Sequence, residues 1–152
     1  MRFIERRAII TMLIKWPITT TIVYVLYYRV VVPILGFMFK EKTIKENNET
    51  KLIEKKSVFI ANLYYIETEE EANLLIKQIE KKYYDAKHHC FAYRLQNNGD
   101  IIERFSDNGE PSGTAGLPIL GILRGKELTN VLIIVTRYFG GILLGTGGLV
   151  RA

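Results

Sequence analysis

The clearest pattern along the chain is a series of apolar runs, separated by polar and glycine-rich segments, between residues 57 and 135. Val131–Val135 is wholly apolar, which is typical of a strand buried on both faces. Ser57–Ile66 is rich in β-branched and aromatic residues and predicts another strand. Between them, Glu69–Tyr83 carries apolar residues three and four positions apart, which predicts an amphipathic helix. These three runs indicate one domain with its own core.

Shorter signals supply further elements. Thr68 and Glu71 have the spacing of a capping box, so the helix is expected to begin directly after Thr68. His88–Leu95 and Ile101–Phe105 predict two strands. Asn97–Asp100 is expected to join them in a hairpin, because Asn-Gly accepts the positive φ of tight turns.

Two more helices are expected beside the glycine-rich segments. One is predicted over Leu117–Arg124, with Pro118 in its first turn, and the last begins near Gly147. Strands and helices alternate irregularly, which predicts an α+β fold with a mixed sheet. The chain reaches Ala152 barely one turn into the last helix, so we expect the fold to be incomplete at its C-terminus.

The N-terminal segment differs in composition from the rest. Residues 1–37 hold five basic side chains and one acidic, a formal charge of +4, whereas the other 115 residues hold 16 basic and 15 acidic, a charge of +1. A spanning helix needs roughly 20 mostly apolar residues without charge. The apolar run is interrupted at four positions: Lys15, Pro17, Arg29 and Pro33.

This segment has two interpretations, an extension foreign to the domain or a membrane-associated anchor. Only the second would make a membrane a partner. We assign residues 1–40 to a hydrophobic and basic N-terminal extension and residues 41–152 to the domain. Lys40–Lys51 is expected to be a solvated linker or domain edge, because it is a run of charged residues. Cys90 is the single cysteine, which excludes an intrachain disulfide and favours a cytoplasmic protein.

Two glycine-rich segments, residues 105–116 and 137–152, are the first candidates for chemistry, since they hold eight of the twelve glycines. Such density indicates positive-φ turns or close approach of the backbone. Each segment precedes a predicted helix, where successive N–H groups can bind an anion. Neither contains the Gly-Lys-Ser/Thr of a Walker loop, so structural and anion-binding roles both remain open. The candidate anion-binding residues are Ser112, Gly113, Thr114, Gly116, Gly140, Gly141, Gly145, Thr146 and Gly147.

Arg137 is the second candidate, because it directly follows the buried apolar run. An unpaired buried charge is very costly, so this guanidinium needs a partner. Asp107 or Glu110 would satisfy it internally; otherwise it would bind a phosphate or carboxylate of a ligand. Tyr138 would then provide a stacking face.

Histidines and a cysteine follow one another in His88–Cys90, but this spacing does not favour a metal site. Adjacent residues of a strand face opposite sides, so His88 and His89 cannot line one site together and are only supporting residues. We predict no metal and no cofactor. An enzyme is less favoured than a binding protein, and Asp107 or Glu110 would be its general base. No Gly-x-Ser-x-Gly elbow supports a serine hydrolase.

Three long motifs resemble those of the IMPACT/YigZ family. They are Phe-Ser-Asp-Asn-Gly-Glu-Pro-Ser-Gly-Thr-Ala-Gly over 105–116, Arg-Tyr-Phe-Gly-Gly over 137–141, and Leu-Gly-Thr-Gly-Gly-Leu-Val over 144–150. Asp-Ala-x-His-His-Cys over 85–90 also matches the family pattern. The resemblance covers about residues 41–152. It fails at Val58, where the family usually has arginine, which leaves one cation fewer if that arginine helps to bind an anion.

The resemblance implies a ribosomal protein S5 domain 2-like fold and, because family members continue into a ferredoxin-like second domain, a truncated chain. Eukaryotic members of the family act in translational control by binding the activator of an initiation-factor kinase, and bacterial members are suspected of nucleic-acid or ribosome association. We therefore expect a binding protein whose partner is RNA, the ribosome or a translation-control protein. The alternatives are a small-molecule enzyme with an anion-binding glycine-rich site and a pure protein-interaction domain.

Overall fold

The computed structural model describes residues 24–32, 42–97 and 99–152, in two units, Met1–Lys40 and Glu41–Ala152. In the first unit, residues 24–32 are helical around the π-helical turn η1 (Tyr27–Val31), and their side chains are exposed. Among the described residues, no helix is both long and apolar enough to cross a membrane. The predicted extension or anchor lies mainly outside the described residues and stays a prediction.

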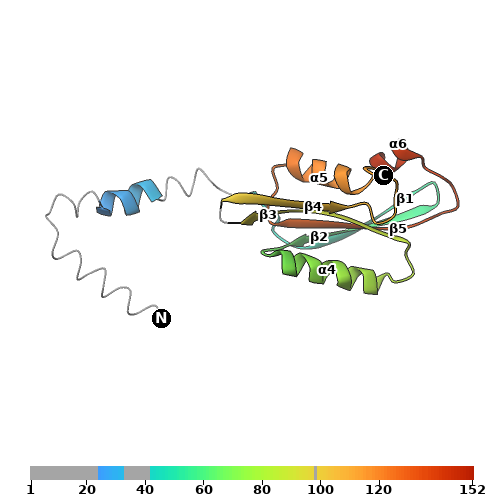
Figure 1. Ribbon diagram of the computed structural model, residues 1–152, viewed down its shortest axis with the longest axis horizontal. Coiled ribbons are helices and arrows are strands. Elements are labelled where there is room, and N and C mark those ends of the chain that lie inside the picture. Colours follow the sequence, from blue (N-terminus) through green and yellow to red (C-terminus); the bar gives the residue numbers. More distant parts are fainter. Residues whose placement is uncertain (1–23, 33–41, 98) are drawn as a thin grey trace. The chain divides into compact units, whose positions relative to one another are not determined.

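A five-stranded sheet forms the centre of the second unit (Figure 1). Its strands are β1 (Asn48–Glu54), β2 (Ser57–Tyr65), β3 (His88–Asn97), β4 (Asp100–Ser106) and β5 (Val131–Tyr138). They lie in the order β1-β2-β5-β3-β4, and all four pairings are antiparallel. The α+β class is confirmed, but the sheet is antiparallel and not mixed. β2 and β3 point the same way without pairing, because β5 lies between them and runs opposite to both.

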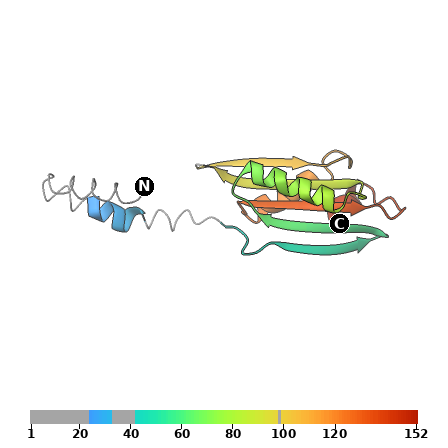
Figure 2. The same cartoon turned by 90° about the horizontal axis from the view of Figure 1, so that it is seen from below.

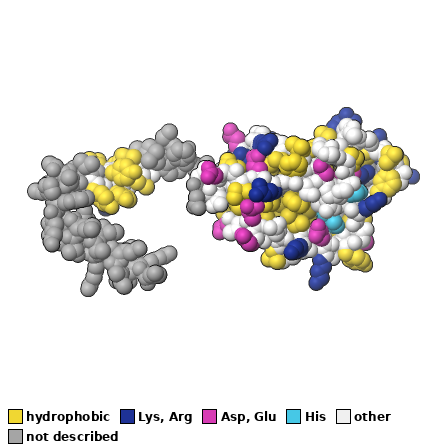
Figure 3. Space-filling view, in the orientation of Figure 1, with side chains coloured by type: hydrophobic (Ala, Val, Ile, Leu, Met, Phe, Trp, Pro, Cys, Tyr) yellow, Lys and Arg dark blue, Asp and Glu magenta, His cyan; other side chains and the backbone are white. Residues whose placement is uncertain are grey.

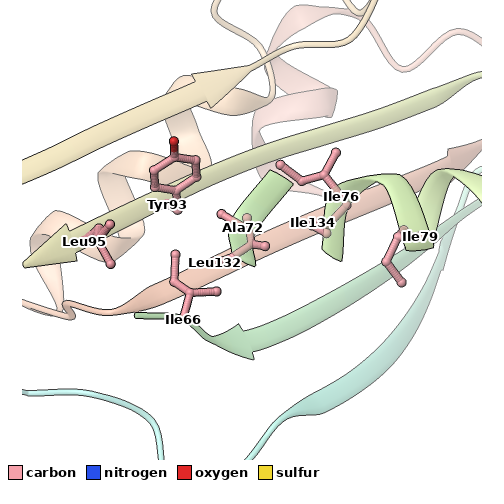
Figure 4. Packing of buried hydrophobic residues seen from close by; sticks show 8 residues of the cluster. All are labelled: Ile66, Ala72, Ile76, Ile79, Tyr93, Leu95, Leu132 and Ile134. Atoms are coloured by element: carbon pink, nitrogen blue, oxygen red, sulfur yellow. The ribbon is translucent and has the colours of Figure 1, made fainter. Parts of the chain in front are cut away.

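Helices cover both faces of this sheet (Figures 1 and 2). Helix α4 (Glu69–Lys82) covers one face, and α5 (Gly116–Gly125) and α6 (Thr146–Arg151) lie on the other. The core under α4 (Figure 4) is Ile66, Ala72, Ile76, Ile79, Tyr93, Leu95, Leu132 and Ile134. The core under α5 is Cys90, Ala92, Ile119, Leu120, Leu123 and Val131. Strand β5 contributes to both cores, which explains its continuous apolar run.

The predicted start of α4 is confirmed. The Thr68 side chain accepts a hydrogen bond from the backbone N–H of Glu71 at 3.1 Å, as an N-cap does. The Glu71 carboxylate accepts from the backbone N–H of Glu67 at 2.9 Å, one residue before the N–H that a capping box would use.

Strand β1 was not predicted, since Lys40–Lys51 was expected to be a linker or domain edge. All seven of its side chains are exposed, so no alternation of apolar and polar residues marks the strand. The turn into β2 also carries no Asn-Gly signal, although Lys55 and Lys56 adopt φ values of +44° and +65°. This prediction was wrong because an exposed edge strand buries no apolar face.

Glu49 attaches this edge strand to the rest of the domain. Its carboxylate accepts hydrogen bonds from Asn62 Nδ2 at 2.7 Å, Lys82 Nζ at 2.7 Å and the Tyr83 hydroxyl at 3.1 Å. The bond from Lys82, followed by that from Asn62, lowers the pKa of Glu49. In addition to the antiparallel backbone pairing of β1 with β2, this carboxylate links β1 to α4, which compensates for the few apolar contacts that an exposed strand makes.

Candidate functional site

The loop before α5 does form a nest of backbone N–H groups, but an internal carboxylate already binds it. Asp107 accepts hydrogen bonds from the N–H groups of Gly113 at 2.8 Å, Ala115 at 3.0 Å and Gly116 at 2.8 Å. Burial raises the pKa of Asp107, but these three bonds outweigh it and hold the pKa below its usual value. An external anion would have to displace Asp107. In the structure these N–H groups bind a side chain of the same chain, and the anion site expected at Gly113 and Gly116 stays a prediction.

Other members of this loop have local partners or structural roles. The Thr114 hydroxyl donates to the Pro111 carbonyl at 2.6 Å, and Ser112 is exposed. A Cβ on Gly116 would lie 2.9 Å from backbone atoms of Ser106, so the start of α5 approaches β4 too closely for any side chain.

Arg137 forms an internal pair with Glu110. Its Nη1 donates to Glu110 Oε1 at 2.5 Å, and the two side chains are only 8% and 6% exposed. The guanidinium also lies 5.5 Å from the Phe59 ring and 5.6 Å from the Phe139 ring. Of the two interpretations of Arg137, the structure shows the internal one, with Glu110 and not Asp107 as partner. Arg137 Nε is buried without a hydrogen-bond partner among the described residues.

The two histidines lie on opposite faces of β3, as their spacing predicts. The His88 ring bonds through Nδ1 to the Asn108 carbonyl at 2.8 Å, and its Nε2 lies 3.9 Å from Glu110 Oε1. His88 is the register partner of Arg137. His89 is buried beside Thr136, 3.2 Å from its hydroxyl, and burial lowers the pKa of His89. Of the two histidines, only His88 therefore lies beside Arg137 and Glu110.

Tyr138 does not provide the expected stacking face for Arg137. Neighbouring residues of a strand project to opposite sides, so Tyr138 faces away from the α5 side. Its hydroxyl donates to Asp85 at 2.7 Å, a bond that raises the pKa of Tyr138 to about 12. Val58 is the register partner of Tyr138 and lies on the same face. An arginine at this position would therefore point away from Arg137 and Glu110.

The glycines after β5 serve the backbone. A Cβ on Gly140 would lie 2.0 Å from the carbonyl carbon of Lys56, and the Gly140 N–H donates to Ser57 Oγ at 3.2 Å. Gly140 thus allows the loop to contact the β1–β2 turn, and its expected role in anion binding stays a prediction. Gly141 and Gly145 have positive φ, as tight turns demand. Gly147 is exposed on α6.

Both glycine-rich segments line one cavity of about 370 Å³, which we call the Arg137 cavity. Figure 3 shows histidine, acidic and apolar side chains close together on the surface of the domain. The lining residues are Lys87, His88, Glu110, Pro111, Arg137, Phe139, Leu143, Leu144, Gly145, Thr146 and Leu149. The structure therefore brings Glu110, Arg137 and the predicted loop residues Gly145 and Thr146 together with His88. Lys87 and Phe139 also line the cavity, and the sequence analysis did not select them.

A second cavity of about 360 Å³ lies between the sheet and α5. Phe59, Ile133, Val135, Ile119 and Ile122 give it apolar walls, and Cys90 also lines it. Burial raises the pKa of Cys90 to about 12, so its thiol is a core group without nucleophilic character at neutral pH. Within the described ranges, no three His, Cys, Asp or Glu side chains are placed to hold a metal ion.

The protein is thus an antiparallel α+β domain. One of its glycine-rich loops binds an internal carboxylate, and a buried Arg–Glu pair lies between the two loops. The Impact N-terminal domain family matches residues 55–152, which is more than half of the chain. The chain belongs to the IMPACT family.

Known proteins that are similar in sequence to this chain are members of the same family. IMPACT family member YvyE of Bacillus subtilis (strain 168) is 47% identical over 110 residues, which cover 72% of this chain and 50% of that protein. IMPACT family member YigZ of Escherichia coli (strain K12) is 44% identical over 99 residues, covering 64% and 48%. A crystal structure of a hypothetical protein superposes with a TM-score of 0.68 at 38% identity, covering 72% of this chain and 54% of that one. The chain spans about half the length of the curated relatives it matches.

Proposed function

We propose that residues 41–152 form a cytoplasmic binding domain of translational control, which holds a phosphate group of RNA at the Arg137 cavity and is not an enzyme. Family membership supports the link to translation, because the eukaryotic members act in translational control. The ribosome and proteins of translational control are the other partners that such a domain would meet.

The charge of the Arg137 cavity carries this proposal. Of the described residues, Lys87, His88 and Arg137 line it, together with one acidic side chain, Glu110. Glu110 is bonded to Arg137, so that pair is neutral. Lys87 is exposed and makes no ion pair with the described residues. Among the described residues, one unpaired cation therefore remains at the rim, and an anionic group would be attracted there.

The positions of the two carboxylates argue against the enzyme alternative. A general base must have its oxygen within hydrogen-bond reach of the proton that it removes. Asp107 is occupied by three backbone N–H groups, and Glu110 Oε1 by Arg137. Both candidates for a base thus serve the fold.

The test is RNA binding measured by fluorescence anisotropy with a labelled single-stranded oligonucleotide, for the full chain and two variants. Lys87→Gln removes the cation at the cavity, and Lys77→Gln removes an exposed lysine on α4 as a matched control. We expect Lys87→Gln to weaken binding and to reduce the slope of log K against log salt by about 0.7, as for one lost phosphate contact. Equal affinity and slope for the two variants would exclude the Arg137 cavity as the phosphate site.

A further inference from the structure

Beyond the Arg137 cavity, the end of the sheet formed by the β1–β2 turn and the loop after β5 carries a group of cationic side chains around exposed apolar ones. We infer that this basic end, defined as Lys55, Lys56, Lys87, Phe139 and Arg151, is a binding surface for single-stranded RNA. The inference rests on the proposed function and extends it, since it places most of the phosphate contacts outside the cavity and outside the glycine-rich motifs.

Contacts between the turn and the loop bring these residues together. Gly140 lies directly against the backbone of Lys56 and donates to Ser57 Oγ at 3.2 Å. Both views of the ribbon place the turn and the loop at the same end of the domain (Figures 1 and 2). Phe139 and Lys56 therefore lie on neighbouring segments although 82 positions of sequence separate them.

Two adjacent cavities connect the remaining cations. Lys55, Leu144 and Arg151 line a cavity of about 240 Å³. Leu144 also lines the Arg137 cavity, together with Lys87 and Phe139. Four exposed cations of the described residues thus lie around the loop after β5, namely Lys55, Lys56, Lys87 and Arg151. Glu54 is the acidic side chain that lines the smaller cavity beside them. Figure 3 shows Lys and Arg side chains in dark blue alternating with yellow apolar groups at this end.

The conformation of the turn is the strongest sign that the charges serve a purpose. Glu54 pairs with Ser57, so Lys55 and Lys56 are the two central residues of a tight hairpin, with φ values of +44° and +65°. Positive φ at both positions favours Asn and Gly and is unfavourable for lysine. The chain therefore carries two cations at its hairpin tip against the conformational preference of lysine. Such departures from local preference concentrate at functional sites.

An exposed aromatic ring favours a single-stranded partner. Phe139 is 50% exposed, and Leu143 beside it is 83% exposed. Proteins that bind single strands combine cations along the phosphate backbone with aromatic rings on which unpaired bases stack. A duplex hides its base faces and would offer no base to stack on the exposed part of the Phe139 ring.

The experiment compares two triple variants of the full chain, which lose the same charge. Lys55→Asn/Lys56→Gly/Arg151→Gln removes three cations of the basic end and gives the turn the residues that its φ angles favour. Lys42→Gln/Lys77→Gln/Lys126→Gln removes three exposed lysines elsewhere and is the control. With single-stranded RNA, the first variant should lower the slope of log K against log salt by about 2, that is three contacts at about 0.7 each, and the control should not.

Phe139→Ala should weaken binding to single-stranded RNA at least about fivefold, from the loss of one stacked base, and should leave duplex binding unchanged. Circular dichroism of each variant verifies the fold. Equal slopes for the two triple variants, with a reduced slope for Lys87→Gln, would overturn the basic end but leave the proposed cavity site intact. Absence of RNA binding by the unmodified chain at low salt would overturn both. Stronger binding to duplex than to single-stranded RNA would overturn the choice of partner.

Discussion

Replacing Arg137 by methionine should destabilise the domain severely. Arg137 and Glu110 have side chains 8% and 6% exposed, with Nη1 and Oε1 2.5 Å apart. Methionine keeps part of the volume between Phe59 and Phe139 but leaves the Glu110 carboxylate buried without its cation. A buried charge that loses its partner costs about 3–5 kcal/mol. The free energy of unfolding of a domain this size is about 5–15 kcal/mol, so Arg137→Met should leave it marginally stable.

A matched exposed pair shows why burial decides this magnitude. Arg104 and Glu69 are 3.6 Å apart, with side chains 61% and 33% exposed. Exposed ion pairs contribute about 0–1 kcal/mol, because water solvates each charge after the other is removed. Arg104→Met should therefore change the free energy of unfolding by less than about 1 kcal/mol. The loss in free energy of unfolding should therefore be several-fold larger for Arg137→Met than for Arg104→Met.

Urea unfolding at pH 7, followed by circular dichroism, measures both costs. The double variant Arg137→Met/Glu110→Met completes a thermodynamic cycle, and it should recover most of the stability, because apolar replacement of a buried pair is often neutral or stabilising. A cost below about 1 kcal/mol for Arg137→Met would refute the reasoning, since only a solvated or flexible pair behaves so. A double variant as unstable as the sum of the single ones would show that packing, and not the unpaired charge, sets the cost.

Three further predictions concern other contacts. Gly140→Ala should cost about 3 kcal/mol in thermal or urea unfolding, because its Cβ would overlap Lys56; Gly121→Ala, where α5 leaves open space, should instead stabilise by about 0.4–1 kcal/mol. Asp107→Asn should cost about 1.5–3 kcal/mol at pH 7. The lowered pKa of Asp107 stabilises the fold above the unfolded value of about 3.9 and loses this effect as pH falls through the folded pKa, so the cost should shrink in acid. Cys90 should resist iodoacetamide at pH 8 until urea unfolds the domain, and rapid labelling of the native protein would contradict its burial.

The elements that bury an apolar face could be predicted from the sequence. The helix α4 carries apolar residues at helical spacing, and Thr68 marks its start. The strand β5 is a continuous apolar run, and β2 and β3 are rich in β-branched, aromatic and other apolar residues. Strand β1 carried no such signal, because all its side chains are exposed and its turn uses Lys55 and Lys56 at positive φ. Sequence patterns report burial, so an edge strand that buries no apolar face is not detected by them.

The candidate site was harder to predict, because it depends on which residue meets which. The need of Arg137 for an acidic partner followed from its position after a buried run, but the choice between Asp107 and Glu110 depended on how the loop folds. Asp107 bonds N–H groups six to nine positions further along, and Glu110 is left to reach β5. Tyr138 was assigned to the wrong face of the sheet. It was grouped with Arg137 because the two are neighbours in sequence, but adjacent residues of a strand point to opposite faces.

Because the anion-binding groups of the glycine-rich motifs are paired internally, we expect residues near the motifs to bind the partner. A nest of N–H groups and a buried arginine are both suited to anions, and this domain satisfies them with Asp107 and Glu110. An incoming phosphate would have to displace the Asp107 carboxylate from the three N–H groups that it binds, which disfavours the nest as a binding site. Lys55, Lys56, Lys87 and Arg151 are exposed and form no ion pair within the part of the chain that the structure describes. The glycine-rich motifs thus fix the geometry of the loops, and the cations that these loops bring together are the groups with charge left to offer a partner.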